Sequence, residues 1–194
     1  MRMRVRILAF VTTVVVGGGL ALWPGTAQAA AGAGSEIPAS AVVAPMKRVG
    51  VDHAIAHAHG YEVRVDSTGV EYAVKKGTVT PFNEVPGDCG SSFIYFTAVD
   101  TSKHYSSVYT GFRLNSGEAG AVFVNWYISI VDNYGASSPA WADPAASVHF
   151  WAKVHPFTAG GPTIAYADVL YGSTATLWSG TICFSYGPSD SKQL

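Results

Sequence analysis

The chain has 194 residues, with 12 Lys and Arg against 13 Asp and Glu, and a formal net charge of −1 at pH 7. No basic stripe is present, which excludes the electrostatic footprint of a nucleic-acid-binding protein. A chain of this length suits one domain with additional terminal segments.

Residues 1–29 have the three parts of an export signal. Arg2, Arg4 and Arg6 form a basic region, an apolar run follows, and Ala27-Gln28-Ala29 supplies a small-x-small cleavage site. The apolar run is short for a bilayer span, and no second run of spanning length follows it. We therefore expect a secreted, extracellular protein with no membrane anchor after cleavage.

Residues 30–48 are rich in Ala, Gly, Ser and Pro, a composition that predicts a disordered leader. Residues 49–77 are expected to form a short helix followed by a β-hairpin. Asp52 can cap the helix and Gly60 can end it, while alternating runs on both sides of an Asp…Gly turn at 66–69 predict the hairpin. The sequence leaves open whether residues 30–77 are a removable pro-segment.

The rest of the chain, residues 78–194, has the periodicity of β-strands. The clearest run is 121–131, where large apolar residues occupy every second position, as in a strand with one buried face. A strand over 147–155 is expected to turn Trp151 to solvent, and a last strand over 174–186 is expected to carry a bulge or bend at Gly180. In the run 121–131, the alternating large apolar residues are Val122, Val124, Trp126, Ile128 and Ile130.

Six such strands without a helical period between them predict an all-β fold. The expected architecture is a small antiparallel β-sandwich, with one short N-terminal helix and a hairpin ahead of it. An immunoglobulin-like arrangement is compatible with a buried Trp126, although the cysteine spacing differs from that of antibody domains.

Cys89 and Cys183 are the two cysteines and have one possible pairing. In an oxidising compartment a disulfide is the expected state of such a pair. It would close a loop of roughly a hundred residues, worth on the order of 4–5 kcal/mol in the chain-entropy description.

A resemblance to the nucleophile loop of chymotrypsin-like proteases lies in residues 86–92, which read Pro-Gly-Asp-Cys-Gly-Ser-Ser. It implies that Cys89 is a nucleophile and that His53, His57 or His59 is its base. Those proteases have a further glycine where Ser91 stands here, and they place a whole barrel ahead of the nucleophile. The segment before Cys89 is too short for that barrel, so a disulfide in a turn is the favoured interpretation.

His53 and His57 lie one turn apart on the expected helix, which is the spacing of many zinc sites. The sequence fixes no third ligand, and a solvated histidine-bearing face is the commoner explanation of such a pair. A metal site at these two residues is therefore a weak candidate, and no cofactor is expected.

Aromatic residues are the candidates for ligand binding. Trp151 is expected on an outer strand face, and Tyr134 and Trp141 in a long irregular segment over 132–146. Many carbohydrate-binding modules hold sugar rings with exposed aromatic side chains in this way. Packing of the same rings against the core is the alternative.

Four aspartates, Asp100, Asp132, Asp143 and Asp168, lie near expected strand ends. A glycosidase needs two carboxyl groups at a set separation, but turn and capping roles are more usual for such residues. We therefore expect a secreted, non-enzymatic β-sandwich that binds an extracellular glycan or a protein surface. The alternatives are an extracellular hydrolase, centred on Cys89 or on a carboxylate pair, and a structural cell-surface accessory protein.

Overall fold

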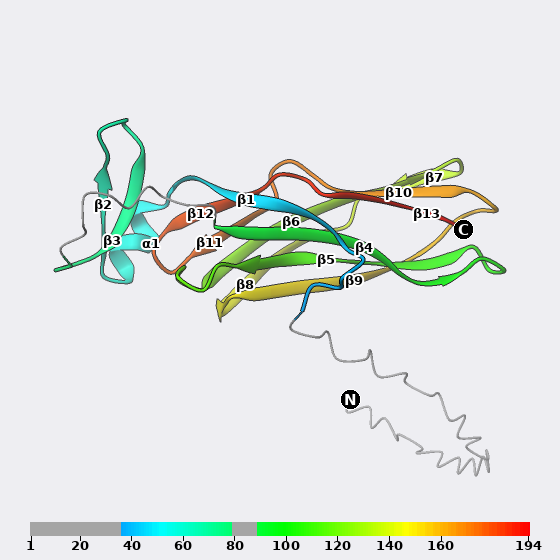
Figure 1. Cartoon of the computed structure of the whole chain (residues 1–194), viewed down its shortest axis with the longest axis horizontal. Helices are drawn as coiled ribbons and strands as arrows, with labels where there is room; N and C mark the ends of the chain where they lie inside the picture. Colours follow the sequence, from blue (N-terminus) through cyan, green and yellow to red (C-terminus); the bar gives the residue numbers. More distant parts are fainter. Residues whose placement is uncertain (1–35, 79–88) are drawn as a thin grey trace, which may run out of the picture. The chain divides into compact units, whose positions relative to one another are not determined.

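The computed structural model describes residues 36–78 and 89–194 (Figure 1). The expected signal peptide, residues 1–29, the first part of the expected disordered leader, residues 30–35, and residues 79–88 lie outside the described residues. Within the described part the structure is almost entirely antiparallel β-strand, which confirms the predicted all-β class. No helix in that part is long and apolar enough to cross a membrane.

The structure has thirteen strands and one helix within the described residues. Their bounds are β1 Val42–Val51, α1 His53–Ala58, β2 Tyr61–Val65, β3 Glu71–Lys75, β4 Gly90–Asp100, β5 Tyr105–Leu114, β6 Ala121–Asp132, β7 Gly135–Ser137, β8 Ala140–Val148, β9 Phe150–Thr158, β10 Ile164–Val169, β11 Thr174–Leu177, β12 Thr181–Ser185 and β13 Ser189–Gln193. Eleven of these strands form one sheet in the order β13-β10-β6-β11-β12-β1-β4-β5-β9, with β7 and β8 paired to β6. Strands β2 and β3 form a separate hairpin.

Strand β6 has the buried face that its sequence predicts. Its even positions from Val124 to Ile130 are fully buried, whereas Phe123 and Tyr127 are 36% and 38% exposed. Because successive side chains of a strand point to opposite faces, one face of β6 enters the core and the other meets solvent. The period-two prediction for this run is confirmed.

The sheet folds over on itself, so that β6 lies across from β5 and β9. The Trp126 ring centroid is 5.7 Å from that of Phe112 in β5 and 5.6 Å from that of Trp151 in β9. Trp126 Nε1 donates a hydrogen bond to Thr110 Oγ1 at 3.0 Å, and Thr110 Oγ1 donates to the Phe93 carbonyl oxygen at 3.0 Å. The buried indole N–H is thereby satisfied. The two layers expected for a sandwich are two parts of one hydrogen-bonded sheet.

The expected disordered leader over residues 30–48 is wrong for its last part. Residues from Val42 onward form β1, which pairs with β12 on one side and with β4 on the other. Its backbone groups are hydrogen-bonded along both edges, and Met46 is fully buried. These contacts stabilise the strand although the segment has few large apolar residues.

The short helix and the hairpin are confirmed. Asp52 Oδ1 accepts a hydrogen bond from the Ile55 amide at 3.0 Å and so caps the start of α1. Gly60 follows the helix with a φ of 78°, a conformation in which glycine has no steric penalty. The hairpin strands β2 and β3 pair on both sides of the turn at 66–69.

Two expectations between residues 132 and 155 are wrong. The segment 132–146, expected to be irregular, contains β7 and most of β8, and β8 is an edge strand that tolerates Pro144. Ser147 has a φ of 58° and interrupts the alternation between β8 and β9. Trp151 therefore faces the core at 9% exposure, and Val154 faces solvent at 51%.

The run 174–186 forms two strands, β11 and β12, where one strand with a bulge or bend at Gly180 was expected. Gly180 has a φ of 83°, and its amide donates a hydrogen bond to the Leu177 carbonyl at 2.8 Å, so it belongs to the tight turn between them. A Cβ at Gly180 would collide with the Asp52 carbonyl oxygen, since the turn packs against the start of α1.

Candidate binding surface

Three aromatic side chains on the outward face of the sheet pack on one another. Tyr171, in the turn between β10 and β11, is 91% exposed, and its ring centroid lies 4.6 Å from that of Phe184 in β12. The Phe184 ring lies 6.1 Å from that of Tyr186, which is 57% exposed. Both contacts are edge-on, a favourable arrangement for aromatic pairs. We call Tyr171, Phe184 and Tyr186 the aromatic cluster.

The alternation along β12 places two of these rings outside. Cys183 and Ser185 are buried, at 0% and 1% exposure, so Phe184 and Tyr186 point to the opposite face. The disulfide between Cys183 and Cys89, whose Cα atoms are 5.9 Å apart, fixes the buried face of β12. The same covalent bond that stabilises the core therefore sets the direction of the two rings.

A shallow hollow of about 330 Å³ opens beside the cluster. Val49, 58% exposed, stands on one side of it, where the pairing register between β1 and β12 shifts around this residue. Such a bulge redirects the side chain of the extra residue. Lys47 Nζ lies 5.4 Å from the centroid of the Tyr186 ring, within range of a cation–π contact. The hollow is lined by the three cluster residues together with Val49, Ser185 and Gly187.

The neighbouring strands extend this face with uncharged groups. In the pairing register, Thr174 of β11 stands between Phe184 of β12 and Asn125 of β6. No charged side chain occupies the outward positions of β6, β11 and β12, all of which belong to the described range. These positions are Phe123, Asn125, Tyr127, Ser129, Val131, Thr174, Thr176, Ile182 and Phe184, and Tyr186 follows the end of β12.

The two tryptophans expected to bind a ligand lie in a different place. Trp151 is buried and its Nε1 donates to Asp143 Oδ2 at 3.2 Å, while Trp141 packs against it with ring centroids 6.2 Å apart. Lys153 Nζ lies 2.8 Å from Asp143 Oδ2, and this interaction holds the pKa of the Asp143 carboxyl below its ordinary value. These side chains join the edge strands β8 and β9, which share no hydrogen-bonded ladder.

Tyr134, the third expected residue, is exposed but does not join the tryptophans. Its ring occupies the space into which side chains at Gly160 and Gly161 would project. Asp132 Oδ1 accepts hydrogen bonds from the Tyr134 and Gly135 amides at 2.7 and 2.8 Å, so this aspartate shapes the turn between β6 and β7. The structure therefore does not bring the three expected aromatic residues together on one surface.

The histidines have other partners. His53 Nε2 lies 3.1 Å from Glu71 Oε2, and the His59 ring packs on Trp178 with centroids 3.7 Å apart. In residues 36–78 and 89–194, no group of three or more His, Cys, Asp or Glu side chains could hold a metal ion. The structure gives His53 and His57 no third ligand there, and a zinc site needs one.

The hydrolase alternatives gain no support from the geometry. Cys89 is bonded to Cys183 and fully buried, so it has no thiolate with which to attack a substrate. The hydroxyl of Ser102 hydrogen-bonds to Asp100, and together with nearby Lys103 it lowers the pKa of the Asp100 carboxyl. A glycosidase needs a second carboxyl at a set separation, and Asp132 accepts hydrogen bonds from the Tyr134 and Gly135 amides in the β6–β7 turn, which is a structural role.

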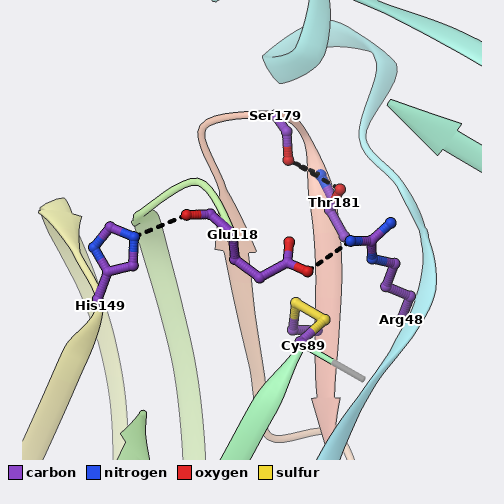
Figure 2. A network of polar contacts seen from close by, with 7 residues as sticks. Arg48, Cys89, Glu118, His149, Ser179 and Thr181 are labelled. Carbon is purple, nitrogen blue, oxygen red and sulfur yellow. Dashed lines mark hydrogen bonds and ion pairs between the residues drawn. A yellow bond between two sulfur atoms is a disulfide. The ribbon is translucent and has the colours of Figure 1, made fainter. Parts of the chain in front are cut away.

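A polar network lies beside the disulfide (Figure 2). The Glu118 carboxylate is 2.6 Å from Arg48 Nη2, and His149 Nε2 donates to the Glu118 carbonyl oxygen at 2.8 Å. Nearby, Ser179 Oγ donates to Thr181 Oγ1 at 2.9 Å in the turn before β12. Glu118 thereby connects the β5–β6 turn to β1 and to the residue before β9, which is a structural role.

No family model, no curated protein and no solved structure matches this chain. Within the described residues, the aromatic cluster is the clearest candidate for a ligand-binding surface. It consists of other residues than the three aromatic residues that the sequence suggested. Its sequence signal was the alternation of Phe184 and Tyr186 with Cys183, whose burial follows from its disulfide.

Proposed function

We propose that the protein is a secreted, non-enzymatic binding module that holds an uncharged glycan on the aromatic cluster. The observation that carries this proposal is the packing of Tyr171, Phe184 and Tyr186 around a hollow on the outward face of the sheet. Aromatic rings offer flat apolar faces to the C–H groups of sugars, and tyrosine hydroxyls can hydrogen-bond to sugar hydroxyls.

The chemistry around the cluster favours a neutral glycan over a protein surface. The adjoining outward positions carry hydroxyl and amide groups, including Thr174 and Asn125, that can donate and accept hydrogen bonds. Protein partners commonly use complementary charges for specificity, and a standard interface covers about 800 Å² per partner. Here Lys47 is the charged side chain beside the rings, and the hollow of about 330 Å³ lies at the lower end of the range of small-molecule sites.

Secretion is part of the same proposal. It rests on the export signal expected in residues 1–29, and the Cys89–Cys183 disulfide supports it. Disulfides form and persist mainly in oxidising compartments outside the cytoplasm.

Retention of the purified protein on insoluble neutral polysaccharides tests the proposal. Tyr186→Ala removes a cluster ring, and we expect it to weaken retention by about fivefold or more, since one aromatic contact contributes on the order of 1 kcal/mol beyond its buried area. Tyr134→Ala is the matched control, because Tyr134 and Tyr186 are both 57% exposed and Tyr134 lies outside the cluster.

Two outcomes would contradict the proposal. One is the absence of retention on every neutral glycan tested. The other is an equal loss of retention in Tyr134→Ala and Tyr186→Ala. Binding to a protein surface that Tyr186→Ala abolishes, without any glycan binding, would assign the cluster to a protein partner.

A further inference from the structure

We infer that the ligand is an extended polysaccharide chain that runs from the aromatic cluster along the outward face of β6 to a second exposed site. This inference rests on the proposed function. The second site is formed by Val131 of β6 and Tyr166 of β10, which pair directly across the ladder and are 41% and 51% exposed. Ile164, two positions before Tyr166 and on the same face, is 45% exposed.

Tyr127 connects the two sites. Its ring lies 4.0 Å from the position that a Cβ on Gly172 would take, and Gly172 is the neighbour of Tyr171 in the cluster. The Tyr127 carbonyl oxygen accepts hydrogen bonds from the Leu170 amide at 2.9 Å and from Ser173 Oγ at 3.1 Å. These bonds fix the β10–β11 turn, and with it Tyr171, against the middle of β6.

The length of the surface exceeds what one sugar ring can cover. Tyr127 and Val131 are separated along β6 by about 13 Å, because a strand rises roughly 3.3 Å per residue. From β6 to Phe184 in β12 the surface crosses β11, which adds about 10 Å at the usual spacing between strands. In Figure 1, β10 and β11 both run beside β6, so the path follows one continuous sheet.

The groups along this path match a neutral chain rich in hydroxyls. Ser129 of β6 and Asp168 of β10 face each other midway between Tyr127 and Tyr166, on the outward side. A carboxylate accepts hydrogen bonds from hydroxyl groups and repels an anionic polymer. Lys47, at the far side of the cluster, carries a positive charge, opposite to that of Asp168. Neither an acidic nor a basic polysaccharide therefore meets a surface of complementary charge along the whole path.

Titration calorimetry with oligosaccharides of β-1,4-glucan, β-1,4-xylan and β-1,4-mannan tests the inference. For the series that binds, the affinity should rise by about tenfold or more from the disaccharide to the hexasaccharide, because contacts at the second site become intramolecular. Tyr166→Ala should lose this gain and keep the disaccharide affinity. Tyr186→Ala should weaken the binding of both ligands, and Tyr134→Ala should behave as the unchanged protein.

The outcomes separate the two proposals. If the disaccharide and the hexasaccharide bind equally, or if Tyr166→Ala binds the hexasaccharide as well as the unchanged protein does, the extended path is wrong while the cluster remains a glycan site. If no oligosaccharide of the three series binds, the extended path is wrong, and if no insoluble neutral polysaccharide retains the protein either, the neutral-glycan function is wrong as well. Melting curves of each variant check that the exposed substitutions leave the fold intact.

Discussion

Replacing Thr110 by valine tests the buried hydrogen bonds that connect the two layers of the sheet. The substitution preserves the shape of the side chain and removes its hydroxyl, which accepts from Trp126 Nε1 and donates to the Phe93 carbonyl, each at 3.0 Å. Thr110 and Trp126 are both 0% exposed, so water cannot replace the lost partner. A buried donor without a partner costs about 1–3 kcal/mol.

We therefore expect Thr110→Val to lower the free energy of unfolding by about 2 kcal/mol, which corresponds to about 4–8 °C in Tm for a domain of this size. The assay is urea unfolding of the oxidised protein, followed by far-ultraviolet circular dichroism and fitted for the slope and the midpoint. Trp126→Phe provides the control, because it keeps an aromatic ring and removes the N–H. In that background Thr110→Val should cost about 1 kcal/mol less.

A neutral Thr110→Val, or an equal cost in both backgrounds, would refute the reasoning. In the first case the hydroxyl would be dispensable. In the second case the cost would come from the bond to Phe93 or from packing, and the indole would play no part in it.

Two further predictions concern β5 and β9. Gly111→Ala should destabilise the protein by about 3 kcal/mol or more, because its Cβ would collide with the Trp151 carbonyl in the paired strand. Gly117→Ala is the control, since its Cβ enters open space and the substitution should be near neutral. Similar melting temperatures of the two variants would contradict this prediction. Burial beside Trp141 lowers the pKa of His155 below its ordinary value of 6.5. The unfolded chain therefore binds a proton at His155 more readily than the folded protein does, and the free energy of unfolding should fall as the pH decreases through about 6.5. It should level off below the lower pKa that His155 has in the folded protein. His155→Gln should flatten that part of the stability curve, and an unchanged curve would exclude His155 as its cause.

The sequence predicts best those strands whose own residues decide their orientation. In β6 the buried face follows from the alternation itself, because five large apolar side chains at every second position can share one side only in an extended strand. Asp52 predicts the start of α1 for an equally local reason, since its carboxylate binds an amide three residues ahead.

The errors arise where tertiary contacts decide. Phe150 and Trp151 are adjacent aromatic residues, and either could face the core; the break at Ser147 and the pairing of Trp151 with Phe112 settle the choice. Strand β1 contains Pro45 and a bulge at Val49, so its local pattern is weak, and it is a strand because β12 and β4 supply partners on both edges.

The candidate site was only partly accessible to sequence reasoning. The outward direction of Phe184 and Tyr186 follows from the burial of Cys183 between large outward neighbours. The position of Tyr171 over Phe184 does not, because it depends on the β10–β11 turn and on its hydrogen bonds to β6.

The position of β1 has a consequence for how the chain matures. This strand is synthesised before every other strand of the large sheet, yet one of its two neighbours, β12, is made almost last. Until the ribosome has delivered that neighbour, the edge of β1 that pairs with β12 lacks its partner. Folding of the large sheet therefore depends on nearly the whole polypeptide, because the pairing of β1 with β12 joins segments from opposite ends of the described chain.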